Sequence, residues 1–165
     1  METPSRWFAS YPESAREIND SSLAHEHLAD LVTHAARDFG PSPAVSTQLP
    51  NGACATLSFD DVDRLTGDFA CYLREVLKVP EGSVVALMTP NCISFMIATM
   101  GVSRAGCIGT NINPLYTAPE VQHQLQDSGA QVLVISNLFG DKADHVVGST
   151  GVEHVVSVAL TDFFP

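Results

Sequence analysis

The stretch Val84-Val-Ala-Leu-Met88 decides the fold class, because five apolar residues in a row lie between turn signals at Pro80 and Pro90. A short valine-rich run that is bounded in this way is typical of a strand buried on both faces. Val132-Leu-Val-Ile135 repeats the pattern later in the chain. We therefore expect an α/β protein with a mostly parallel sheet and helices on both faces.

Strand and helix patterns alternate regularly from residue 80 to residue 165. We expect strands at 84–88, 107–111, 131–135 and 153–158, and helices at 93–104, 118–128 and 138–147. Short links between such elements indicate crossover helices and a Rossmann-like arrangement. The segment 93–102 is apolar nearly all round, which predicts a deeply buried helix.

Two further regions precede this alternation. Residues 1–21 form an aperiodic arm that carries Trp7, Phe8 and Tyr11, and aromatic side chains in a polar arm indicate docking on another surface. Residues 22–79 predict a helix, a β-hairpin around Pro50-Asn51-Gly52, and a second helix. The first helix is expected to begin at Ser22 and to use one apolar face (Leu28, Leu31, Val32, Ala35, Ala36, Phe39).

The second helix shows the clearest helical period in the chain. Ser58 and Asp61 resemble a capping box at its start. Apolar residues follow at helical spacing (Val62, Leu65, Phe69, Leu73, Val76, Leu77).

Composition limits the classes of function. The chain has 165 residues, of which 45% are hydrophobic, and carries 19 Asp and Glu against 8 Lys and Arg, for a net charge of −11. Such a charge disfavours binding to nucleic acid or to anionic membranes. The four cysteines show no C-x-x-C spacing, residues 1–20 lack a signal-peptide pattern, and no apolar stretch is long enough for a membrane span. We therefore expect a cytoplasmic protein with reduced, mostly buried thiols.

Several motifs resemble catalytic or binding sites but lack the required context. The first strand–helix junction, Met88-Thr-Pro-Asn-Cys92, has no glycine with which to cradle a phosphate. Gly101-Val-Ser103 imitates a nucleophile elbow, but its serine falls near the end of a helix, so we expect a small packing residue. Potential metal ligands on helical faces are expected to form a polar, solvated surface instead (His27, Asp30, His34, Asp141, Asp144, His145). His123 is expected to be exposed or hydrogen-bonded and not catalytic.

Two stretches carry a family resemblance. The segment Gly82–Asn91 with Arg104-Ala-Gly106 resembles a landmark of acyl- and aryl-CoA synthetases, and Asn113-Pro-Leu-Tyr-Thr117 with the run Glu120–Ala130 resembles bacterial long-chain fatty-acid–CoA ligases. The opening residues Trp7, Tyr11-Pro12 and Glu17-Ile18 are also similar to the start of those ligases. The resemblance implies the N-terminal subdomain, in incomplete form, of the adenylate-forming fold, with residues 1–165 belonging to the AMP-binding domain.

The resemblance also implies a reaction. In that family, ATP activates a carboxylate as an acyl-adenylate, and the thiol of CoA then displaces AMP, with Mg²⁺ supporting the first step. The family's phosphate loop, adenine segment, ribose-binding Asp and catalytic Lys have no matching positions here. We therefore expect no catalytic, cofactor-binding or metal-binding residue within residues 1–165. The matched residues should instead shape and cap turns (Asn113, Pro114, Tyr116, Thr117, Glu120, Gly129).

The last residues, Asp162-Phe-Phe-Pro165, should leave two phenylalanines with little cover after an apolar strand, which predicts a truncated product or an interrupted gene. Because the family's phosphate loop has no matching position here, we expect the isolated chain to be inactive. Two alternatives remain open: a ligase for a medium-chain or aryl acid, and a non-catalytic module that forms a homodimer through the N-terminal arm. A Rossmann-type nucleotide binder ranks last. Peripheral contact of a longer protein with a membrane also remains open.

Overall fold

A four-stranded parallel sheet organises the computed structural model, which describes residues 6–12 and 27–165. The strands are β3 (Val84–Met88), β4 (Ile108–Asn111), β5 (Val132–Ser136) and β6 (His154–Val158), in the order β4-β3-β5-β6. All three pairings are parallel, with Ala86 opposite Thr110 on one side and Leu133 on the other. The predicted sheet is confirmed, and each strand begins and ends within one residue of its expected position.

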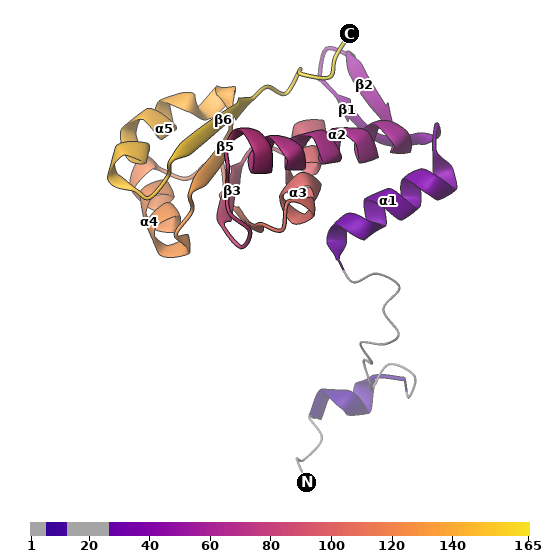
Figure 1. The fold of residues 1–165 in the computed structure, drawn as a ribbon, viewed down its shortest axis with the longest axis horizontal. Helices are drawn as coiled ribbons and strands as arrows, with labels where there is room; N and C mark the ends of the chain where they lie inside the picture. Colours follow the sequence, from indigo (N-terminus) through magenta and orange to yellow (C-terminus); the bar gives the residue numbers. More distant parts are fainter. Residues whose placement is uncertain (1–5, 13–26) are drawn as a thin grey trace.

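Helices cover both faces of this sheet (Figure 1). α3 (Ile93–Arg104) and α2 (Phe59–Cys71) lie on one face, whereas α4 (Ala118–Ser128) and α5 (Gly140–Val146) lie on the other. Val85 and Leu87 face the first layer, and Ala86 and Met88 face the second, all at 2% exposure or less. The central strand is therefore buried on both faces, as its unbroken apolar run predicted.

A β-hairpin lies beside the first residues of α3. Its strands are β1 (Pro43–Gln48) and β2 (Cys54–Ser58), and they pair antiparallel. The backbone N–H of Ile93 donates to Thr47 Oγ1 at 3.1 Å, so a strand residue satisfies one of the open donors at the start of the helix.

The prediction that Phe163 and Phe164 lack cover is wrong. Both are half-buried and pack against the core that the hairpin forms with α1, α2 and α3. Ser94 Oγ donates to the Ala159 carbonyl at 3.2 Å, and this bond joins the segment after β6 to α3. Elements from much earlier in the sequence, the hairpin and the helices α1, α2 and α3, therefore cover the two phenylalanines.

The first long helix, α1 (Leu28–Phe39), is capped by His27. The expected cap, Ser22, lies outside the described residues. Val32 is buried on the expected apolar face, but Leu28, Leu31 and Phe39 are exposed. The Phe39 ring also lies against that of Phe59, with 5.3 Å between the ring centroids. Because three of its apolar side chains remain exposed, α1 packs through only part of its apolar face. A short 3₁₀ helix, η1 (Arg6–Ser10), is the described element of the arm.

α2 continues into a π-helix, η4 (Tyr72–Val76). The Leu77 N–H donates to the Tyr72 carbonyl at 3.0 Å and closes a turn that is wider than an α-helical turn. The residues of this turn therefore do not keep the α-helical spacing. Leu73 remains fully buried, but Val76 is 64% exposed. Val76 therefore shares the helical spacing of the apolar residues before it but does not reach the core.

The predicted helix at 138–147 is also not a continuous α-helix. Short 3₁₀ helices η5 (Asn137–Phe139) and η6 (Val147–Ser149) flank the α-helical part, α5.

Arg104 joins three helices at the end of α3. Its Nη1 donates to the Asp63 carbonyl at 2.7 Å and to Thr66 Oγ1 at 3.0 Å, both on α2. Its Nη2 donates to Asp63 Oδ1 at 2.7 Å and to Thr33 Oγ1 of α1 at 2.6 Å. The ion pair is mostly withdrawn from water, with side-chain exposures of 27% for Arg104 and 32% for Asp63.

Gly101 allows this approach. A Cβ added there would lie 2.7 Å from Phe69 Cδ1, closer than real Cβ contacts, and 3.1 Å from the Thr66 carbonyl oxygen, which is a tight contact. Only glycine therefore fits where α3 crosses α2.

We expect the Arg104→Met substitution to lower the free energy of unfolding by about 1–3 kcal/mol, because Asp63 and the hydroxyls of Thr33 and Thr66 lose the guanidinium donor and the half-buried Asp63 carboxylate loses its ion pair. Urea unfolding followed by circular dichroism measures the change. Arg37→Met is the matched control, since the Arg37–Asp38 pair is exposed at 69% and 58%. It should change stability by less than about 0.5 kcal/mol. Equal losses in the two variants would contradict the role given to Arg104.

Candidate functional site

The carboxyl ends of β3 and β5 mark the place where an open α/β sheet commonly binds ligands. The chain runs from β3 outward to β4 and then returns to the other side of β3, so the connections reverse direction between β3 and β5. Thr89 follows β3, Ser136 is the last residue of β5, and both are buried. Thr89 Oγ1 donates to the Pro90 carbonyl at 3.0 Å, and Ser136 Oγ accepts the N–H of Leu138 at 3.4 Å. Both hydroxyls therefore close local turns.

The turn from β4 to α4 lies at the same edge of the sheet. Asn113 Oδ1 accepts the N–H of Leu115 at 3.0 Å, and the Asn113 carbonyl accepts the N–H of Tyr116 at 3.0 Å. This geometry confirms the prediction that the Asn113 side chain holds the turn.

α4 begins with the predicted cap. Glu120 Oε2 accepts the backbone N–H of Thr117 at 2.8 Å and its hydroxyl at 2.7 Å. These two bonds lower the pKa of the Glu120 carboxyl below its usual value, and the bond from the backbone N–H has the larger effect. At the other end, Gly129 has φ +65° and ends the helix in the left-handed conformation. The cap at Thr117 and Glu120 and the helix end at Gly129 are thus as predicted.

Lys142 of α5 completes the turn, and no local pattern predicts it. Its Nζ donates to the carbonyl oxygens of Pro114 and Tyr116 at 2.6 and 2.7 Å and lies 5.3 Å from the Phe139 ring centroid. The turn between β4 and α4 is therefore bound to α5 by one ammonium group.

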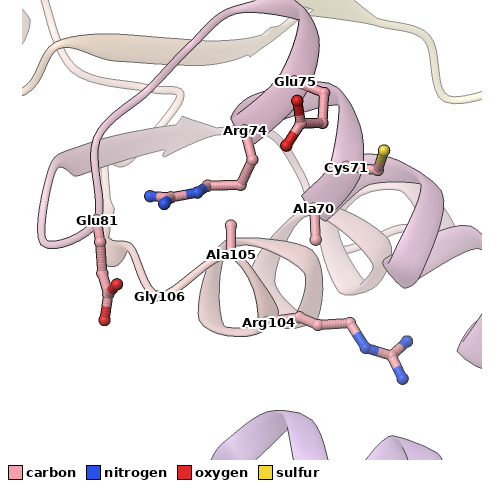
Figure 2. Close-up of a pocket in the computed structure, with 8 residues that line it drawn as sticks. All are labelled: Ala70, Cys71, Arg74, Glu75, Glu81, Arg104, Ala105 and Gly106. Carbon is pink, nitrogen blue, oxygen red and sulfur yellow. The ribbon is translucent and has the colours of Figure 1, made fainter.

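A shallow hollow of about 360 Å³ lies where η4 meets the end of α3 (Figure 2). The Arg74 side chain extends into it and donates to the Val79 carbonyl at 3.2 Å, whereas the Arg104 guanidinium points away, toward its bonds on α1 and α2. Gly106 has φ +71°, and a Cβ there would lie 2.9 Å from Glu81 Cγ. Each residue of the Arg104-Ala-Gly106 landmark is thus tied to packing, since Ala105 is itself buried.

The structure separates most of the residues that imitate catalytic or metal sites. Ser103 lies inside α3, which rules out the strand-to-helix geometry of a nucleophile elbow. The His27 N–H donates to Asp30 Oδ2 at 3.0 Å, so this pair caps α1. Within the described ranges 6–12 and 27–165, no three His, Cys, Asp or Glu side chains cluster closely enough to hold a metal ion.

The cysteines differ from expectation. All four are free, but Cys54 and Cys71 are exposed and Cys92 and Cys107 are half-buried. Cys54 begins the β2 edge of the hairpin and Cys71 ends α2, so neither reaches the core. Burial raises the pKa of the Cys107 thiol. The prediction of mostly buried thiols is wrong.

None of the helices described is both long enough and apolar enough to cross a membrane.

The fold matches solved structures of acid–CoA ligases. An anthranilate CoA ligase in complex with anthranoyl-AMP superposes with a TM-score of 0.77 at 22% identity, over 88% of this chain and 28% of the other. A long-chain-fatty-acid–CoA ligase from Archaeoglobus fulgidus gives 0.72 at 26% identity, over 89% of this chain and 31% of the other. The architecture is therefore that of the adenylate-forming enzymes.

The sequence gives the family. The model of the AMP-binding enzyme family matches residues 32–164, and the chain belongs to that family. The long-chain-fatty-acid–CoA ligase of Haemophilus influenzae is 36% identical over 94% of this chain, and 4-coumarate–CoA ligase 5 of Oryza sativa is 41% identical over 58% of it. The chain spans 27% of the length of the Haemophilus relative and 17% of the rice relative.

Removing the ammonium of Lys142 should loosen the Asn113–Thr117 turn without unfolding the sheet. In Lys142→Met we expect the amides of Leu115 and Tyr116 to exchange with solvent about tenfold faster, because the carbonyls beside them lose their donor. Hydrogen exchange followed by NMR measures these rates. Lys78→Met is the matched control, since within the described ranges Lys78 pairs with Glu75 at the surface, both about 70% exposed. Similar rates in both variants would show that Lys142 does not hold the turn.

Proposed function

We propose that the chain forms the first part of an AMP-forming long-chain fatty-acid–CoA ligase. Such an enzyme converts a fatty acid, ATP and CoA into acyl-CoA, AMP and pyrophosphate through an acyl-adenylate. The observation that carries the proposal is the 36% identity to the Haemophilus influenzae ligase over 94% of this chain. The capped Asn113–Ala130 segment supports it, because the residues that resemble those ligases are the ones that shape and anchor α4.

We infer that the groups that bind ATP, Mg²⁺ and CoA and carry out the chemistry lie outside residues 1–165. Two features support this inference. The junction after β3 has no glycine with which to cradle a phosphate. The polar side chains described at the carboxyl edge of the sheet, Thr89, Asn113 and Ser136, are engaged in local hydrogen bonds. The role of residues 1–165 would then be to build one face of the larger domain.

We also assign the protein to the cytoplasm, where ATP and CoA are available. The free thiols of all four cysteines fit a reducing compartment.

The isolated chain should show no fatty-acid-dependent exchange of pyrophosphate into ATP. A longer protein that begins with this chain should show exchange, and it should prefer long-chain fatty acids over medium-chain and aryl acids. Radioactive pyrophosphate exchange over a panel of these acids measures both. Exchange by the isolated chain would contradict the placement of the chemistry, and a preference for aryl or medium-chain acids in the longer protein would favour the other ligase.

We further propose that the arm contributes to a homodimer. Trp7 and Tyr11 of the arm are 63% and 49% exposed, and aromatic side chains are enriched at protein interfaces.

Light scattering at several concentrations tests the dimer. The mass of the complete chain should be that of a dimer, and deletion of residues 1–20 should halve it. Trp7→Ala with Tyr11→Ala is a milder variant that keeps the chain length, and it should weaken association in the same direction. An unchanged mass after the deletion would rule out an arm-mediated dimer.

A further inference from the structure

Gln131 connects the amino ends of three strands through its backbone. It stands directly before β5. Its N–H donates to the carbonyl of Val84, the first residue of β3, at 2.9 Å. Its carbonyl accepts the N–H groups of Glu153 and His154 at 2.8 and 3.2 Å, where the chain enters β6. The starts of β3, β5 and β6 therefore meet at one residue.

The side chain of Gln131 contains a buried acceptor without a donor. Its Oε1 is withdrawn from solvent, and no group within residues 6–12 and 27–165 donates a hydrogen bond to it. No other buried side-chain oxygen or nitrogen in those ranges is left in this state. An unbonded buried carbonyl oxygen is energetically costly, and ordered water commonly supplies the missing donor in native proteins. Gln131 Oε1 therefore marks a place where a small donor is expected to bind.

A hollow of about 30 Å³ lies beside Gln131. Its walls come from three segments: residues 77–80 after η4, Gln131 itself, and Glu153 with His154 at the start of β6. About 10–15 Å³ of free space admits one water molecule, whereas pockets for organic ligands measure roughly 300 Å³ or more. The hollow therefore has the size for water and excludes larger ligands.

Residues 77–80 offer a bound water further partners. The N–H groups of Leu77 and Val79 already donate to helix carbonyls, at 3.0 and 2.9 Å. Lys78 lies between them at φ +56°, and neither its N–H nor its carbonyl forms a hydrogen bond with the residues that the structure describes. Lys78 also lines the hollow. A water molecule there can thus find polar groups on both sides, as buried waters require.

From these observations we propose that the hollow binds one water molecule. The water donates a hydrogen bond to Gln131 Oε1 and forms a second bond with the Lys78 backbone. It thereby ties the turn after η4 to the residue that holds the starts of three strands. Because the walls come from residues 77–80, 131 and 153–154, the site needs no further segment of a longer protein. The inference concerns the packing of the sheet and does not depend on the proposed ligase activity.

A high-resolution crystal structure of the complete chain tests the site directly. It should show a water oxygen about 2.7–3.2 Å from Gln131 Oε1. In solution, the Lys78 N–H should show a nuclear Overhauser effect to a long-lived water molecule. A Gln131 side-chain amide that bonds residues 77–80 directly, with no water between them, would overturn the proposal.

Variants of Gln131 test whether its side chain holds the water. Gln131→Met keeps the length of the side chain but removes the amide, so the number of long-lived waters measured by oxygen-17 relaxation dispersion should fall by about one. The Overhauser effect at Lys78 should disappear with it. Gln131→Glu keeps an acceptor oxygen and should retain the water.

Gln122→Met is the matched control, because it makes the same change on α4, away from the hollow. It should leave the number of long-lived waters unchanged. An unchanged number in Gln131→Met would contradict the site, and so would an equal loss in Gln122→Met.

Discussion

The Arg104 guanidinium is the contact on which the arrangement of the first three long helices depends. It lies at the end of α3, the helix that packs on the sheet, and it bonds to both α2 and α1. Because a guanidinium presents donors in a fixed plane, it sets the distance and the direction between the helices that supply its acceptors. Gly101, one turn earlier, allows α2 and α3 to approach closely enough for these bonds. The hairpin and α1 pack against α2 and α3 in a shared core.

Lys142 has a comparable role on the other face of the sheet. There the acceptors are two carbonyls of the turn before α4, so a charge on α5 holds a segment that has no regular structure of its own. In a chain with 8 basic residues against 19 acidic ones, two of the basic side chains are thus bonded inward. Most of the acidic residues within the described ranges are exposed, so they give this surface a negative field.

The residues that resemble the ligase family serve the scaffold in this structure. Thr117 and Glu120 cap α4, Arg104 bonds the end of α3 to α1 and α2, and Gly106 lies in close contact with Glu81. A family landmark can therefore reflect packing constraints as much as chemistry. The chain spans about a quarter of the length of its Haemophilus relative. In a protein of that length, the scaffold residues and the reacting groups can come from different parts of the sequence.

The sequence by itself determined the elements whose causes are local. The apolar runs of β3 and β5, the capping boxes at Ser58 and Thr117 and the left-handed end at Gly129 depend on residues within a few positions of one another. Only the tertiary structure decided the partners of Arg104 and Lys142, which lie up to 71 and 28 residues away in the chain. The exposure of Val76 and the cover over Phe163 belong to the same group, since a π turn and a distant hairpin set them. The physical reason is that periodicity and capping report short-range geometry, whereas a long side chain finds its acceptors only after the helices have packed.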